Sequence, residues 1–489
     1  MTGRAPLVVV GNPENRRVTL FRAAAAEAGV PVEVLPWRRP ATGPVRLPDA
    51  AVVRIDSPGE DAEVDRLLRG ADRPAEHGEI VGLAAWYSGL RDALGRLGEA
   101  VRSAGATLLN DPDDVLAMFD KRVCHARLTA AGVPVPPALA ALSTTSAGRV
   151  RPSGGYAELR AAMRAARWSR VFVKPAHGSS ASGVLALQVA PGRIRATTSV
   201  EVAGDGRLYN SLRVRDYTDE RQVAAIVDRL APDGLHVERW FPKAGLDGRT
   251  IDLRVLVIAG RPEHVVVRAS PGPLTNLHLG NARGDLAAVR AAMGEPAYAA
   301  ALHSCVRAAA CFPGSLHVGV DLLVGTDWRR HVVAEVNAFG DLLPGLSDPA
   351  GRSSYAAELH ALRTGRFDRW RAGLASTAEP PPTPPPTPEP DPTAEPVPAA
   401  TAVPPPTPEP EPAAEPVPAA TAVPAATGGL AARAGLLSAA GLVATVVPNG
   451  RVGLAATAEP GNQQARRAGE GGSGQHEIQE AGMKVGRAA

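Results

Sequence analysis

Three oxygen-bearing residues in the segment Gly319–Asp341 have the types and spacing of a divalent-cation site. A hairpin turning at Trp328 would place Asp321 opposite Glu335, and Asn337 would share the face of Glu335 because strand side chains alternate. Two carboxylates that close repel each other unless a cation lies between them. Carboxylate and amide oxygens suit Mg²⁺ better than zinc, and Mn²⁺ would accept the same set. The alternative is a structural pair, with one carboxyl protonated or bound to arginine.

A second segment, Ile251–Ser270, carries two arginines in an apolar alternating pattern. Alternation places Asp252 and Arg254 on one face of a strand. A turn centred on Arg261 would set Arg254 opposite Arg268, and like charges across a strand pair are destabilising. The pattern therefore predicts that a polyanion lies between the two arginines. Otherwise both arginines face solvent.

A lysine precedes a loop of small residues in VFVKPAHGSSASGVLAL, Val171–Leu187. Lys174 would emerge at the end of a strand, and the loop after it would let backbone N–H groups approach an anion. The candidate loop residues are Gly178, Ser179, Ser180 and Gly183. Taken alone, the pattern fits an anion site and a flexible surface hairpin equally well.

The elements that would position these residues begin with an α/β region. Leu7–Val10 and Val32–Leu35 read as strands around an Ala-rich helix that ends near Ala28, the opening of a parallel sheet. The first loop lacks the GxGxxG and GxxxxGKS patterns of dinucleotide folds and P-loops. We expect one α/β domain over residues 1–110, then a single helix from Asp113 to Gly132.

Residues 376–489 have a different composition. PPTPEP occurs at Pro385–Pro390 and again at Pro405–Pro410, among Ala, Thr and Glu. Such a segment buries too little surface to offset its ordering entropy, which predicts a disordered tail. The apolar stretch Gly429–Val447 leaves a membrane helix as a minor alternative, but Gly, Ala and the following Pro448 favour none. Function is therefore expected in residues 1–375.

Composition narrows the class of protein. The 489 residues carry 53 Lys and Arg against 50 Asp and Glu, a net charge of +3, which gives no basic excess for nucleic acid. Three cysteines cannot form a disulfide framework, so we expect a cytoplasmic protein. The N-terminal apolar run reads as a strand and not as a signal peptide. Cys305 and Cys311 are expected in the core.

Six ordered segments resemble those of ATP-grasp enzymes, in the branch of glutathione synthetase and the ribosomal-protein glutamate ligases. They are Asp120-Lys121; Lys174 with HGSSASG; Glu238 in VERWF; Asp252-Leu253-Arg254; Asn276–Gly280; and Asp321 with Glu335 and Asn337. The resemblance implies an α/β and α+β fold. The N-terminal domain would be followed by an ATP-grasp subdomain over residues 111–235, which carries the glycine- and serine-rich loop after Lys174 as a lid, and by a second subdomain over residues 236–375, which carries the metal site.

The resemblance also implies roles for the residues. The nucleotide would be bound by Lys121, Lys174, Gly178, Ser179, Ser180, Gly183 and Asn276, with adenine at the backbone of Glu238 and Arg239 and ribose at Asp252. Mg²⁺ would be held by Asp321, Glu335 and Asn337, and catalysis would use Arg254, Arg268 and Lys174. The implied activity is an ATP-dependent carboxylate–amine ligation through an acyl phosphate. The substrates would be a small carboxylate and an amine, or a peptide or carrier protein.

Two departures from the family pattern fall where the acceptor would bind. Leu274 stands where relatives often have arginine, for which Arg283 or Arg268 could substitute, and Pro344-Gly345 is displaced from its usual distance to Asn337. A small-molecule phosphotransferase and a non-catalytic nucleotide-binding protein are the alternative functions. We expect no membrane or nucleic-acid partner, and the sequence leaves a homo-oligomer open.

Overall fold

The computed structural model describes residues 5–139, 145–146, 149–150, 154–178, 181–339 and 345–377. All of them belong to the first of the two units into which the chain divides, Met1–Pro386. The expected tail, the stretch Gly429–Val447, and the residues Ser179, Ser180 and Pro344 lie outside the described residues. Among the helices of the described part, none is long and apolar enough to cross a membrane.

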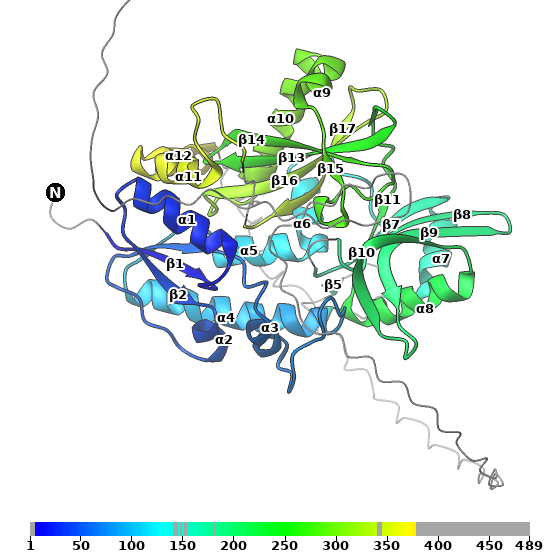
Figure 1. Ribbon diagram of the computed structural model, residues 1–489, viewed down its shortest axis with the longest axis horizontal. Coiled ribbons are helices and arrows are strands. Elements are labelled where there is room, and N and C mark those ends of the chain that lie inside the picture. Colours follow the sequence, from blue (N-terminus) through cyan, green and yellow to red (C-terminus); the bar gives the residue numbers. More distant parts are fainter. Residues whose placement is uncertain are drawn as a thin grey trace, which may run out of the picture. The chain divides into compact units, whose positions relative to one another are not determined.

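The N-terminal region is a parallel sheet between helices, as the sequence predicts (Figure 1). Its strands run in the order β2-β1-β3-β4: Val32–Pro36, Leu7–Gly11, Val52–Ile55 and Thr107–Leu108. Val9 packs with Phe21 of α1 (Arg16–Glu27), whereas Val8 and Val10 pack with α4 (Leu83–Ser103). Alternation thus buries both faces of the sheet. The helices α2 (Arg38–Thr42) and α3 (Ala62–Arg69) lie beside α4.

The second sheet is antiparallel and contains two strands that the sequence pattern does not reveal. Its order is β10-β9-β8-β7-β11: Leu208–Tyr217, Arg193–Val202, Leu185–Ala190, Arg170–Pro175 and Leu235–Arg239. The helices α7 (Tyr156–Ala165) and α8 (Glu220–Leu230) pack against it. The strands β9 and β10 are rich in Arg, Ser and Thr, and their register shifts between Asn210 and Arg215. Neither strand keeps a clean apolar alternation along its length.

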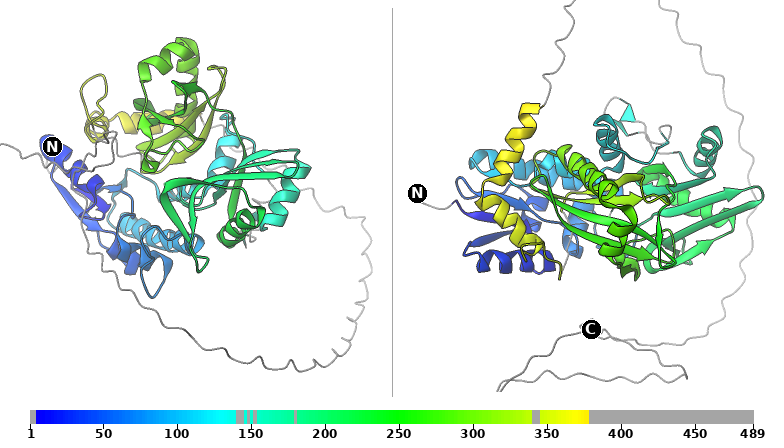
Figure 2. Two further views of the ribbon diagram at one scale, coloured as in Figure 1. Left: turned by 45° about the vertical axis from the view of Figure 1, so that its right-hand side comes forward. Right: turned by 90° about the horizontal axis from the view of Figure 1, so that it is seen from above.

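The third sheet is also antiparallel, and its order is β15-β14-β13-β16-β17 with β12 paired to β13. Their bounds are Ala282–Arg283, Arg261–Ser270, Arg249–Ile258, His317–Val324, His331–Asn337 and Gly245–Leu246. The helices α9 (Leu286–Met293) and α10 (Glu295–Ala310) pack on one face. Tyr355 and Leu359 of α11 (Ser354–Arg363) pack on the other, and Figure 2 shows α11 and α12 (Arg366–Thr377, both yellow) beside the blue helix α1.

The helix expected from Asp113 to Gly132 is in fact two helices, so that prediction is wrong. The helix α5 (Pro112–Phe119) ends at Asp120, whose backbone is extended (φ −97°, ψ 104°). The carboxylate of Asp120 accepts from Arg122 N and Val123 N and begins α6 (Lys121–Ala130), as N-cap aspartates do. The break lets Lys121 N donate to the carbonyl of Ala176 at 3.0 Å, beside the lid.

The predicted register of β13 with β14 is also wrong. Arg254 faces Val266, and it is Asp252 that faces Arg268. The turn consists of Ala259 and Gly260, with φ of 44° and 75°, the positive values that two-residue hairpin turns require. A register shift next to Pro262 then moves the pairing again, since proline has no N–H to donate.

In the hairpin β16–β17 the predicted pairing is confirmed, because Asp321 faces Glu335. The strand ends pair Val324 with His331, and an uninterrupted ladder from there would set Asp321 opposite Ala334. A register shift between Asp321 and Leu322 inserts one extra residue in β17 and brings Glu335 into place.

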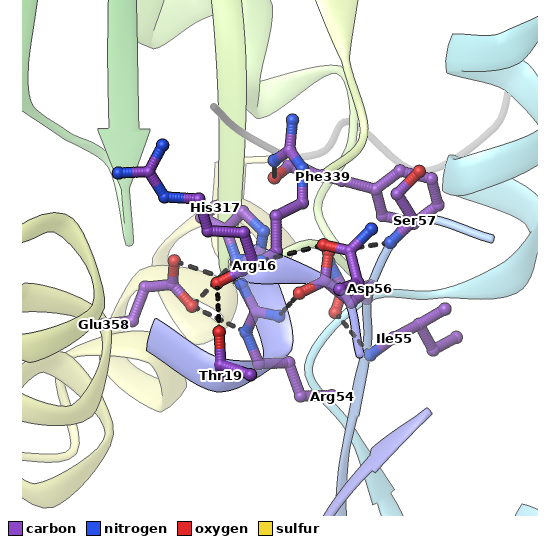
Figure 3. Close-up of polar contacts among 12 residues, drawn as sticks. Arg16, Thr19, Arg54, Ile55, Asp56, Ser57, His317, Phe339 and Glu358 are labelled. Atoms are coloured by element: carbon purple, nitrogen blue, oxygen red, sulfur yellow. Dashed lines mark hydrogen bonds and ion pairs between the residues drawn. The ribbon is translucent and has the colours of Figure 1, made fainter. Parts of the chain in front are cut away.

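A buried arginine joins the N-terminal sheet to the third sheet and α11 (Figure 3). Arg54 of β3 is 1% exposed and forms ion pairs with Asp56 at 2.7 Å and Glu358 at 2.9 Å. Burial alone would lower the pKa of Arg54, but the carboxylates of Glu358 and Asp56 raise it above its ordinary value. His317 Nδ1 of β16 lies 3.4 Å from Glu358 Oε2, so three elements share one charged cluster.

Candidate functional site

A cavity of about 600 Å³ is lined by residues of the second and third sheets, of the helices α1, α4, α5 and α6, and of the loop after β3. It brings together most of the residues singled out from the sequence: Lys121, Lys174, Gly178, Glu238, Asp252, Arg254, Arg268, Asn276, Asp321, Glu335 and Asn337. Gly183 and Arg239 do not line it. The cavity therefore gathers eleven predicted residues from segments that are far apart in the sequence.

The carboxylates of Asp321 and Glu335 are surrounded by cationic side chains. Arg254 Nε lies 2.5 Å from Asp321 Oδ1, and Arg268 Nη2 lies 3.3 Å from Asp321 Oδ2. Burial raises the pKa of Asp321 above its usual range although both arginines oppose the shift. On the other strand, Lys121 Nζ lies 3.1 Å from Glu335 Oε1. Burial would raise the pKa of Glu335, but Lys121 and Lys174 hold it below its usual range.

The donor set fits a hard divalent cation. Two carboxylates and one amide offer only oxygen ligands, the set that Mg²⁺ prefers. Asn337 donates its amide N–H to the carbonyl of Gly319 at 3.3 Å, which leaves the amide oxygen as its remaining ligand atom. Within the described residues no cluster of three or more His, Cys, Asp or Glu side chains could hold a metal. A site of this kind would thus need the amide oxygen or oxygens of a bound phosphate.

Lys174 lies at the end of β7 and is held by a buried carboxylate. Its Nζ lies 2.7 Å from Glu238 Oε2, while His236 Nε2 lies 2.8 Å from Glu238 Oε1. Burial would raise the pKa of Glu238, but Lys174 and His236 lower it to about 2. Burial lowers the pKa of His236, so a neutral imidazole donates its Nε2–H to the ionised carboxylate. Burial also opposes the charge on Lys174, but Glu238 and Glu335 raise its pKa.

The sequence analysis missed His236. The signal for it was the alternation in LHVER, which places His236 and Glu238 on one face of β11. Glu238 lines the cavity through its side chain. Arg239 has an exposed side chain and donates its backbone N–H to Pro137 O at 2.8 Å, so the expected adenine contact at this amide lacks a free donor.

Both carboxylate oxygens of Asp252, the residue expected at the ribose, are bound by protein side chains. Its Oδ1 accepts from Arg268 Nε at 2.6 Å, and its Oδ2 accepts from the hydroxyl of Thr275. Lys243 Nζ lies 3.6 Å from the same Oδ2. Burial would raise the pKa of Asp252, but Arg268 and Lys243 hold it below its usual range. The carboxylate of Asp252 thus fixes the position of Arg268.

Lys243 is a further cation that the sequence analysis missed. Its Nζ donates to Pro273 O and to Thr275 Oγ1, both at 2.9 Å, so it is tied to the residues that flank Leu274. Leu274 is buried with Val184 and Leu279. Burial lowers the pKa of Lys243, which Asp252 partly offsets. Positive charge at this part of the cavity therefore comes from Lys243 and Arg268.

The loop expected as the lid begins at Gly178 and ends at Gly183, and each of these glycines has its own structural role. Gly178 O accepts from Lys121 Nζ at 2.7 Å, which places the start of the lid against α6. Gly183 has a φ of +73°, and a Cβ there would lie 2.6 Å from Pro175 Cγ. A larger residue would displace the strand that carries Lys174. The loop of Asn276 is closed by Asn281, whose Nδ2 donates to the carbonyls of Leu274 and Asn276.

The cysteines take no part in this site. Cys305 is buried in α10, and burial raises the pKa of its thiol, so a thiolate nucleophile is disfavoured. Cys311, just after α10, is partly exposed, and all three cysteines are free thiols. His331 contacts Ser304, with Nε2 and Oγ 2.8 Å apart. Of the two cysteines expected in the core, Cys305 is buried and Cys311 is half-buried.

No protein-family model matches the chain, and no curated protein sequence matches it. Among solved structures, ATP-grasp ligase PsnB complexed with minimal precursor, Mg and ADP is 19% identical, over 74% of this chain and 98% of that one, with a TM-score of 0.39. Macrocyclase MdnC from Microcystis aeruginosa MRC, bound with precursor peptide MdnA, is 11% identical over 74% and 100%, with a TM-score of 0.41.

D-alanine–D-alanine ligase from Bacillus anthracis, complexed with ATP, is 14% identical over 76% of this chain and 99% of that one, with a TM-score of 0.38. The chain is similar to ATP-grasp ligases, the same family that its six ordered motifs resemble.

Proposed function

We propose that this protein is a Mg²⁺- and ATP-dependent carboxylate–amine ligase. The observation that supports it is the convergence of six cationic side chains and an oxygen-only ligand set in one cavity. The cations are Arg17, Lys121, Lys174, Lys243, Arg254 and Arg268. The cavity also holds carboxylates that pair with several of these cations. Fixed cations of this kind suit a triphosphate and the charge that develops during phosphoryl transfer.

The proposed roles follow from position. Lys121 and Lys174 bind phosphate oxygens of ATP beside the lid, and Glu238 with His236 holds the Lys174 ammonium in place. Asp321, Glu335 and Asn337 would hold Mg²⁺, which supplies neutralisation of the terminal phosphates when bound. Arg254 and Arg268 stabilise the phosphoryl group in transfer, and Asp252 orients Arg268.

The proposed reaction has two balanced steps. A substrate carboxylate oxygen attacks the γ-phosphorus of ATP, the bond to the β–γ bridging oxygen breaks, and ADP leaves. An amine nitrogen then attacks the acyl carbon and loses one proton, while the acyl–oxygen bond breaks and phosphate leaves with the electron pair. The protein contributes positioning and charge, so it needs no nucleophile of its own.

Mass spectrometry of the product tests this proposal. The purified full chain is incubated with Mg²⁺ and ATP against amino acids, peptides and cell extract, and ADP release is followed. We expect ADP release that requires both a carboxylate and an amine, with a product that has lost one water relative to its parts. ADP release with a hydroxyl acceptor alone would indicate a phosphotransferase, and ATP binding without turnover a non-catalytic protein.

The proposed location is the cytoplasm. The three cysteines are free, and Cys124 and Cys305 are buried as thiols, which suits a reducing compartment.

A further inference from the structure

Three aromatic rings form a row along the cavity that the nucleotide roles do not use. Trp86 of α4 lies 5.6 Å from Phe119 at the end of α5, and Phe119 lies 5.5 Å from Phe339, which follows β17. All three line the cavity. Trp86 and Phe119 are only half-buried, so an apolar group placed against them would be removed from water. We call these three rings the aromatic wall.

A strained loop brings a carboxylate to the same cavity. Glu60, in the loop after β3, lines the cavity with an exposed side chain and has a φ of 63°, which is rare for glutamate. Two asparagines hold this loop. Asn12 Nδ2 donates to Pro58 O and Gly59 O, both at 3.0 Å, and Asn15 Nδ2 donates to Glu60 Oε2 at 3.0 Å.

Strain that neighbouring residues hold in place is a feature of functional sites, and here it fixes where the carboxylate lies. Glu60 has no role in the ATP site described above.

The first turn of α1 holds the loop and the aromatic wall together. Asn15, its N-cap, binds Glu60, and Arg17 donates from Nη1 to the carbonyl of Phe339 at 3.3 Å. Phe339 is two residues beyond Asn337, so the wall begins beside the proposed metal ligands. One short segment thus holds both an anionic group and an apolar surface in the cavity that contains the proposed metal ligands.

We propose that Glu60 and the aromatic wall form the acceptor subsite, which takes an amine whose ammonium stands beside an aromatic or branched apolar side chain. An apolar amino acid and the amino terminus of a peptide both have this chemistry. The carboxylate of Glu60 binds the ammonium by a charge-assisted hydrogen bond, and the wall covers the side chain. This assignment rests on the proposed ligase function and concerns binding only.

Calorimetry with two probes tests the subsite on the full chain. L-phenylalaninamide carries the ammonium and the ring, whereas 3-phenylpropanamide carries the ring alone. We expect the first to bind on the order of tenfold more tightly than the second, as a charge-assisted contact implies. Glu60→Gln should remove this preference and leave binding of the neutral amide unchanged. Phe339→Leu and Trp86→Leu should weaken both probes.

Glu14→Gln is the matched control, because Glu14 is exposed in the neighbouring loop and does not line the cavity. Equal behaviour of the Glu60 and Glu14 variants, or equal affinity of wild type for the two probes, would overturn the proposal. Free phenylalanine and the dipeptide Phe-Ala separate the two sources of the ligand: preference for either one supports the subsite, and binding of neither contradicts it.

ATP binding measured on the same variants separates this inference from the proposed function. Wild type and Glu60→Gln should bind Mg-ATP equally. ADP release that depends only on amines without an apolar side chain would refute the subsite and keep the ligase. If Glu60→Gln loses binding of phenylalaninamide but wild type releases no ADP with any amine, the subsite stands and the proposed ligase function is refuted.

Discussion

The hairpins β13–β14 and β16–β17 lie in one sheet and arrange their charges in opposite ways. β13–β14 sets Asp252 against Arg268, and that pair is closed by Thr275 and Lys243. β16–β17 sets Asp321 against Glu335, two like charges that depend on cations from elsewhere. The two hairpins therefore differ in the source of their countercharge: the first pairs opposite charges across its own strands, and the second takes its cations from Arg254, Arg268 and Lys121.

Lys174→Ala has the largest expected effect, because it removes a cation that acts on both Glu335 and Glu238. Turnover should fall by roughly 1,000-fold, the cost of one preorganised charge contact in a transition state. Because Glu238 would be left buried, the free energy of unfolding should fall by about 3 kcal/mol. ADP release and chemical denaturation measure the two effects.

The double variant Lys174→Ala with Glu238→Gln sharpens that result. It should recover stability and stay inactive, since the unpaired carboxylate is gone and the phosphate contact is still missing. Recovery of turnover in the double variant would remove Lys174 from the mechanism.

Glu335→Gln tests the like-charge hairpin directly. Affinity for ATP in the presence of Mg²⁺ should fall by roughly 100-fold, since a ligand carboxylate is replaced by a weaker neutral donor. ATP binding followed in a Mg²⁺ titration measures it. Asp327→Asn, in the exposed turn of the same hairpin, is the control and should bind as wild type does. An unchanged Mg²⁺ dependence in Glu335→Gln would contradict the metal assignment.

Asp252→Asn tests the self-satisfied hairpin. The amide keeps a partner in Thr275 but loses the ionic bond to Arg268, so the free energy of unfolding should fall by about 2 kcal/mol. Mg²⁺ dependence of ATP binding should stay as in wild type. Thermal and denaturant unfolding measure the loss of stability, and ATP binding in a Mg²⁺ titration measures the Mg²⁺ dependence. A loss of Mg²⁺ dependence here would erase the contrast between the two hairpins.

His236→Gln has the smallest expected effect. Glutamine can still donate a hydrogen bond to Glu238. The free energy of unfolding should therefore fall by about 1 kcal/mol, and turnover should fall only a few-fold. His236→Leu, which cannot donate, should lose more turnover at similar stability. Equal kinetics in the two variants would show that His236 packs without positioning Lys174.

The same two hairpins show what a sequence can predict here. Residue types and alternation were enough to pair Asp321 with Glu335. The resemblance to ATP-grasp enzymes was needed for others of the eleven predicted residues that line the cavity, such as Lys121 and Glu238. Alternation could not give the register of β13–β14, because the positions of the Ala259–Gly260 turn and of the Pro262 shift decide it. The predicted and observed partners of Arg254, Arg268 and Val266, are two residues apart, so the side chains keep their faces and change only their partners.

Residues whose role comes from distant neighbours were missed. Lys243 follows β11 and belongs to no motif of the sequence. Its contacts with Thr275 and Asp252 appear only in the folded structure. Phe339 belongs to no motif of the sequence, and its place in the aromatic wall appears only once Phe119 lies beside it. The strands β9 and β10 were missed because polar side chains interrupt their alternation.

The Arg54 cluster has a consequence for engineering this protein. Glu358 of α11 lies 304 residues after Arg54 of β3 in the sequence, yet the charge of its carboxylate is matched by that arginine (Figure 3). A chimaera that exchanged the first 110 residues for those of a relative without this arginine would leave the carboxylate of Glu358 buried without its cationic partner. Strand β3 and helix α11 must therefore be taken from the same parent protein.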